Sequence, residues 1–185
     1  MPAIEFDPPE RFIADSVGPA GQRTFFLQAI RGAQVMTVSL EKEQVRLLGE
    51  SVTELLTEMA GEENAGEEVA PDTGPLHTPI EEDFRARQLT LAWNDARRLV
   101  VIEVSDRETE QEDEQEQASD VDVDTDPQDP VGPQSIIVRL PVGMARAFAQ
   151  RCETSMSGGR PSCPFCGGPL DPGGHICPRA NGYKR

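Results

Sequence analysis

Residues 159–185 make up a segment that cannot form a hydrophobic core. They are mostly glycine, proline and polar residues, yet they contain three of the four cysteines of the chain and one of its two histidines. Burial of apolar side chains cannot order such a segment, so another interaction has to hold it. A metal ion bound by the cysteines is the simplest candidate, and the sequence therefore predicts a small metal-stabilised tail.

The spacing of these cysteines is typical of a zinc knuckle. Cys163 and Cys166 are separated by two residues and followed by a glycine, so a tight turn can direct both thiolates at one ion. After the turn-forming residues 171–174, His175 and Cys177 can supply the remaining ligands. We predict a Cys₃His site for Zn²⁺ formed by Cys163, Cys166, His175 and Cys177.

Cys152 competes with His175 for the fourth position. The one-residue spacing of His175 and Cys177 is less common than the two-residue spacing of a zinc ribbon, which keeps Cys152 open as a ligand. However, Cys152 follows Met144 and Phe148 at intervals of four residues, so it is also expected as a buried thiol on a helix. Because structural zinc sites have four protein ligands, we favour His175.

Two other interpretations of the Cys-x-x-Cys pair stay open. A thioredoxin-like redox pair opens a helix, which Pro164, Gly167 and Pro169 disfavour here. A disulfide needs an oxidising compartment, and residues 1–7 have neither the basic start nor the apolar run of a signal peptide. No apolar run approaches the roughly 18 residues of a membrane span. We therefore expect a cytoplasmic protein.

The net charge of −16 is concentrated in one tract. Twelve acidic residues and one arginine lie between Asp106 and Pro130, so −11 of the −16 belongs there. We predict a disordered acidic insertion over residues 106–132 and a disordered acidic linker over residues 61–79. The simpler interpretation is that the insertion is a solvated loop, and the alternative is that it attracts a basic partner.

Alternating apolar residues predict strands over residues 11–17 and 135–140, and hairpins over residues 23–40 and 87–104. Leu89, Leu91 and Trp93 alternate with small residues, so we expect one buried face with Trp93 in the core. Apolar residues at helical spacing predict two helices, one from Glu41 with Ser39 as its N-cap and one opened by Pro141.

These elements predict an α+β fold, with antiparallel hairpins in a sheet and two packed helices over residues 1–158. A zinc-ribbon-like knuckle over residues 159–185 follows. Both halves of the larger unit run hairpin, strand and helix, and residues 38–40 resemble residues 138–140. A duplication and chance similarity both explain this echo.

The sequence contains no phosphate-binding loop, nucleophile elbow, dinucleotide fingerprint or His-Glu-x-x-His motif. His77 is expected as a solvated loop residue. We expect a non-enzymatic interaction or adaptor protein with a protein partner. Its predicted partner-binding residues are Arg160, Arg179, Asn181, Tyr183, Lys184 and Arg185. A nucleic-acid-binding zinc ribbon, disfavoured by net charge, and an enzyme with an open thiolate site are the alternatives.

The chain resembles the actinobacterial DUF3090 domain family, which has no established activity. The likeness rests on Phe6-Asp7-Pro8, Gly21-Gln22-Arg23-Thr24-Phe25, Leu40-Glu41-Lys42-Glu43-Gln44, Leu91-Ala92-Trp93, Cys163-Pro164, Cys166-Gly167, Gly174-His175, Cys177-Pro178-Arg179 and Asn181-Gly182-Tyr183. The resemblance implies that Cys163, Cys166, His175 and Cys177 act as one unit. Cys152 and the acidic tract lie outside the shared pattern.

Overall fold

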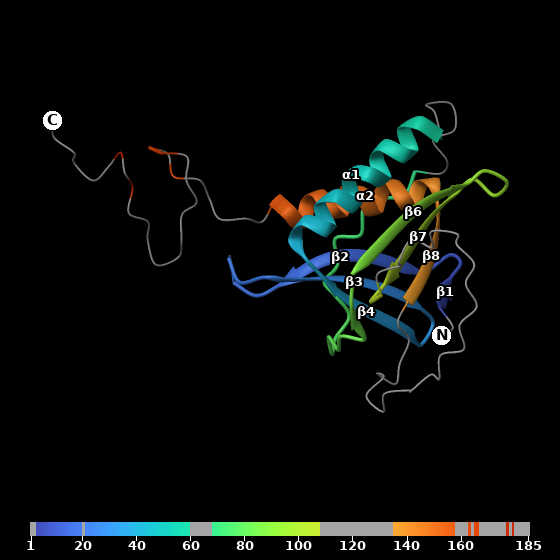
Figure 1. The fold of residues 1–185 in the computed structure, drawn as a ribbon, viewed down its shortest axis with the longest axis horizontal. Coiled ribbons are helices and arrows are strands. Elements are labelled where there is room, and N and C mark those ends of the chain that lie inside the picture. Colours follow the sequence, from blue (N-terminus) through green and yellow to red (C-terminus); the bar gives the residue numbers. More distant parts are fainter. Residues whose placement is uncertain are drawn as a thin grey trace, which may run out of the picture.

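The computed structural model describes residues 3–19, 21–59, 68–107 and 135–157, together with Cys163, Phe165, Cys166, Cys177 and Arg179. Within these residues the chain forms an α+β fold of two four-stranded sheets and two helices (Figure 1). In chain order the elements are β1 (Ile4–Phe6), β2 (Arg11–Val17), β3 (Thr24–Arg31), β4 (Gln34–Leu40), α1 (Lys42–Met59), β5 (Phe84–Arg85), β6 (Gln88–Asn94), β7 (Leu99–Ser105), β8 (Ser135–Pro141) and α2 (Val142–Ser157).

The chain repeats one order of elements. Strands β2, β3 and β4 form an antiparallel sheet and lead into α1, and β6, β7 and β8 do the same before α2. Each sheet is completed by a parallel strand from the other half, because β1 pairs with β8 and β5 pairs with β4. The registers correspond: Phe6 lies opposite Val138, and Phe84 lies opposite Val38. The echo between residues 38–40 and 138–140 therefore marks equivalent strands of an internal structural repeat.

The predicted strands, hairpins and helices are present in the structure, with boundaries shifted by one or two residues. The first helix starts differently from the prediction. Ser39 belongs to β4, and its hydroxyl donates to Glu82, so it is not the N-cap. The backbone N–H of Glu41 instead donates to the side-chain oxygen of Gln44 at 2.8 Å. In a capping box, the side chain at the third helical position accepts from the backbone N–H of the N-cap residue. Glu41 is therefore the N-cap of α1, in place of the predicted Ser39. Pro141 likewise ends β8, and α2 begins at Val142.

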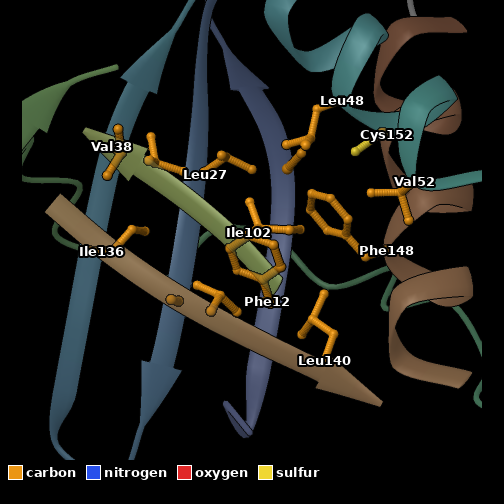
Figure 2. Close-up of a cluster of buried hydrophobic side chains, with 14 of the residues drawn as sticks. Phe12, Leu27, Val38, Leu48, Val52, Ile102, Ile136, Leu140, Phe148 and Cys152 are labelled. Carbon is orange, nitrogen blue, oxygen red and sulfur yellow. The ribbon is translucent and has the colours of Figure 1, made fainter. Parts of the chain in front are cut away.

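The hydrophobic core is formed by both sheets and by the inner faces of both helices (Figure 2). Phe12 from β2 and Phe148 from α2 stack with ring centroids 4.4 Å apart, which joins one sheet to the helix layer. Trp93 is half-buried and packs against the core from β6, with the Arg98 guanidinium 5.7 Å from its ring centroid. Trp93 was expected in the core, but it lies at the edge of the core and is only half-buried.

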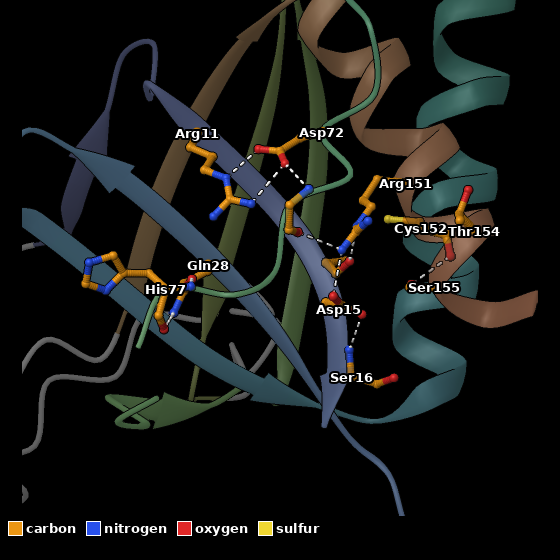
Figure 3. A network of polar contacts seen from close by, with 12 residues as sticks. Arg11, Asp15, Ser16, Gln28, Asp72, His77, Arg151, Cys152, Thr154 and Ser155 are labelled. Atoms are coloured by element: carbon orange, nitrogen blue, oxygen red, sulfur yellow. Dashed lines mark hydrogen bonds and ion pairs between the residues drawn. The ribbon is translucent and has the colours of Figure 1, made fainter. Parts of the chain in front are cut away.

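The segment predicted as a disordered linker, 61–79, is described from residue 68, and there it makes specific contacts with the rest of the fold (Figure 3). The side chain of Gln28 is fully buried; its oxygen accepts from the His77 N–H at 2.6 Å, and its amide donates to the His77 carbonyl and to Thr37 Oγ1. From α2, Arg151 donates to the Gly74 carbonyl at 3.0 Å. Buried polar side chains therefore fasten this segment to the fold, while the His77 side chain is exposed as expected.

The predicted acidic insertion, 106–132, lies outside the described residues except for its first two. Asp106 and Arg107 follow β7 directly. Strand β8 begins at Ser135, opposite Ser105. The tract therefore connects two neighbouring antiparallel strands at the position where the equivalent strands, β3 and β4, are joined by a turn at Gly32 with φ +57°.

Candidate metal centre

Three cysteines of the C-terminal segment converge in the structure. The Sγ atoms of Cys163, Cys166 and Cys177 all lie within 4.8 Å of one another, and those of Cys163 and Cys177 are 3.8 Å apart. Cys163 and Cys177 are buried, while Cys166 is half-buried in a turn with Phe165. A cluster of this size, with the sulfur atoms facing one another, can hold a metal ion.

The backbone of the turn prepares Cys163 for the role of a ligand. Backbone N–H groups of Cys166 and Phe165 donate toward its sulfur and, with smaller contributions from Cys166 and Cys177 side chains, lower the pKa of the Cys163 thiol to about 6. A thiol with this pKa is mostly thiolate at neutral pH, and the thiolate is the form that binds metals. The Cys-x-x-Cys turn thus has the spacing that the sequence predicted for a knuckle, and its backbone N–H groups stabilise the Cys163 thiolate.

Cys152 is not part of this cluster. Its side chain is 1% exposed and belongs to the hydrophobic core, where burial raises the pKa of its thiol to about 12. It packs closely against Gly49 of α1, since a Cβ atom added at Gly49 would lie 2.7 Å from the Cβ of Cys152. Cys152 is therefore the buried helical thiol that its spacing indicated. His175, the predicted fourth ligand, lies outside the described residues.

Of the predicted partner-binding residues, the structure describes Arg179. Its guanidinium is exposed and donates to the carbonyl oxygen of Phe165 at 3.2 Å, although the two residues are 14 positions apart. This contact places a cation beside the turn that carries Cys166. Five further predicted partner-binding residues lie outside the described part of the chain: Arg160, Asn181, Tyr183, Lys184 and Arg185.

Sequence reasoning did not single out Phe165. Its side chain is 63% exposed, more than any other large apolar side chain that the structure describes. Its exposure could have been predicted from its position between Cys163 and Cys166. A tight turn that directs both thiols inward leaves the side chains between them exposed to solvent. An exposed aromatic side chain therefore lies on this turn, and Arg179 binds the backbone of the same residue.

Fold and site together define a class: an α+β protein of two repeated halves, with a C-terminal thiol cluster that can hold a metal ion. The chain belongs to the family described as "Protein of unknown function (DUF3090)", whose model matches residues 4–177. The match spans both repeated halves and all three clustered cysteines, which confirms the family resemblance. No curated protein and no solved structure matches the chain. In the described part of the chain, neither helix has the length and apolar character to cross a membrane.

Proposed function

We propose that this protein is a non-enzymatic interaction module, an adaptor whose C-terminal segment is held in shape by Zn²⁺. The convergence of Cys163, Cys166 and Cys177 carries the proposal, because it occurs in a segment too poor in apolar residues to fold by burial. Thiolate clusters of this kind select zinc over the hard cations Mg²⁺ and Ca²⁺. His175 is the proposed fourth ligand, two residues before Cys177.

The proposed site is structural. Three cysteines and one histidine close the tetrahedral coordination of zinc, whereas catalytic zinc sites keep one position for water or substrate. The described cysteines are all free thiols, which suits a reducing cytoplasmic compartment and the thiolate chemistry of the site. The metal then supplies the folding free energy that this segment lacks.

The proposed partner is another protein, and the metal-ordered segment is its contact surface. Arg179 supports this role because its exposed guanidinium is oriented by the Phe165 carbonyl. Exposed arginine and aromatic side chains are the residue types that contribute most to protein–protein affinity. The remaining proposed contacts come from Arg160, Asn181, Tyr183, Lys184 and Arg185. The basic residues among them contribute to the local positive charge of this segment.

The metal site is tested by the zinc content of the full chain, purified without added metal. We expect about one zinc per chain in the wild type and its loss in Cys177→Ser, because a structural site needs all four ligands. The His175→Ala variant is expected to bind zinc more weakly. Cys152→Ser is the matched control, since it removes a cysteine from the core and should retain the metal.

The opposite result would change the interpretation of the cluster. A wild-type protein without zinc, whose clustered thiols oxidise and reduce reversibly, would replace the structural site with a redox pair. Equal zinc loss in Cys152→Ser and Cys177→Ser would show that the variants lose metal through unfolding, which circular dichroism of the same samples detects.

A further inference from the structure

The two helices form a groove that is lined by residues of both. The groove encloses about 770 Å³ between α1 and α2. Its lining includes Gly49, Ala149 and Cys152, and Leu56 and Met156 add apolar surface. A cavity of about 150 Å³ holds benzene, so this groove has room for an aromatic side chain and a neighbouring polar one.

The walls of the groove carry carboxylates that are available to a ligand. Arg46 is engaged by Glu43 and Glu50 on its own helix. Glu54 from α1 and Glu153 from α2 are exposed, and no described residue forms an ion pair with either of them. The groove lining thus combines apolar side chains with a carboxylate from each helix, and Arg146, which also lines it, is itself engaged. This chemistry suits a ligand that carries both an apolar ring and a cation.

The metal-binding turn presents this combination. We use the name knuckle tip for Phe165 and Arg179, whose contact at 3.2 Å holds the guanidinium next to the aromatic residue. The ring of Phe165 is 63% exposed, and neither residue lines the groove of its own chain. The knuckle tip is therefore not docked within its own copy in this structure.

We propose that the α1–α2 groove binds the knuckle tip of a second copy of this chain. The inference rests on the metal-stabilised segment proposed above and names its protein partner. Phe165 enters the groove over Gly49 and Ala149, and Arg179 pairs with Glu153 on α2. Because Met156 lines the groove one residue before the end of α2, each C-terminal segment leaves its own copy beside the groove that receives its neighbour's tip. Reciprocal exchange about a two-fold axis closes such a dimer.

The molar mass of the full, metal-containing chain tests this inference, measured by light scattering over a series of concentrations. The wild type is expected to be a concentration-dependent dimer, and Phe165→Ala a monomer. Glu153→Arg and Arg179→Glu are each expected to be monomeric, while the double variant regains the dimer because the ion pair is restored with its charges exchanged. Leu47→Ala is the matched control: Leu47 is 48% exposed on α1 and does not line the groove, so this variant should remain a dimer.

Three results would overturn the inference. These are a wild-type chain that stays monomeric at every concentration, a dimer that persists in Phe165→Ala, and a double charge exchange that fails to restore association. If the knuckle tip bound the groove of its own chain, the protein would be a monomer. The expected dimer therefore also distinguishes binding between two copies from binding within one. Zinc content measured on the same samples tests the metal site separately, since a monomer with bound zinc contradicts only the docking.

Discussion

Gly49 of α1 packs directly against Cys152 of α2, and its replacement by alanine has two opposing effects on stability. Alanine stabilises a helix interior by about 1 kcal/mol relative to glycine. At this position, however, the new Cβ would lie 2.7 Å from the Cβ of Cys152, a distance that forces the helices apart. Overpacking of a buried contact costs about 1–3 kcal/mol. Because the opposing atom is a Cβ and cannot rotate away, we expect the cost to exceed the gain, so that Gly49→Ala destabilises the fold.

The expected net loss for Gly49→Ala is about 1 kcal/mol, equivalent to a few degrees in the thermal midpoint of a domain of this size. Chemical and thermal denaturation followed by circular dichroism measure it. The same substitution in a Cys152→Gly background provides the control, since the opposing Cβ is then absent. There Gly49→Ala should stabilise the protein by about 1 kcal/mol, the helix-propensity term alone. Stabilisation by Gly49→Ala in the wild-type background would refute the reasoning from close helix contact.

Three further predictions concern the polar contacts and the buried thiol. Gln28→Leu should destabilise the fold by about 2–4 kcal/mol in urea denaturation, because it leaves the His77 backbone groups and Thr37 without their buried partner; a loss below 1 kcal/mol would show that this network contributes little. The hydrogen bond from Arg11 lowers the pKa of Asp72, so its stabilisation is present above the unfolded-state pKa of about 3.9 and is lost as pH falls through the folded pKa. The stability difference between wild type and Asp72→Asn should therefore be largest near neutral pH and shrink in acid, whereas a pH-independent difference would contradict this origin. Native-state alkylation with iodoacetamide after metal removal should modify the clustered cysteines and spare Cys152, whose thiol is buried and has a pKa of about 12; rapid labelling of Cys152, read by mass spectrometry, would contradict its core position.

Local patterns predicted most of the secondary structure. The hairpin formed by β3 and β4 follows from alternating apolar residues that meet at Gly32, and α1 follows from apolar residues three and four apart. These patterns indicate which side of an element is buried, and the buried side of α1 carries Val45, Leu48 and Val52 at this spacing. The pattern did not predict the residue at which α1 begins, because that boundary depends on the hydrogen bonds of Ser39 and Gln44.

The contacts of residues 68–83 were not predictable in the same way. This segment has the composition of a linker, yet Gln28, Arg151 and Arg11 bind its backbone and side chains from β3, α2 and β2. Each of these residues reads as an exposed polar residue in its local context. Their burial depends on chain segments that are 49–77 positions away, and periodicity carries no information at that range.

For the candidate site, the sequence by itself indicated the ligand chemistry: cysteines concentrate in a segment poor in apolar residues, and the Cys-x-x-Cys spacing fixes how two thiols meet in one turn. The sequence also predicted that Cys177 joins them, and it left Cys152 open. Only the tertiary structure buries Cys152 away from the cluster and places Arg179 against the Phe165 carbonyl. It also decided that the strands divide between two sheets, each completed by a strand of the other half. The physical reason is the same in both cases. Spacing along the chain governs contacts within a turn or a hairpin, whereas contacts between distant segments are chosen by packing and by the pairing of buried polar groups.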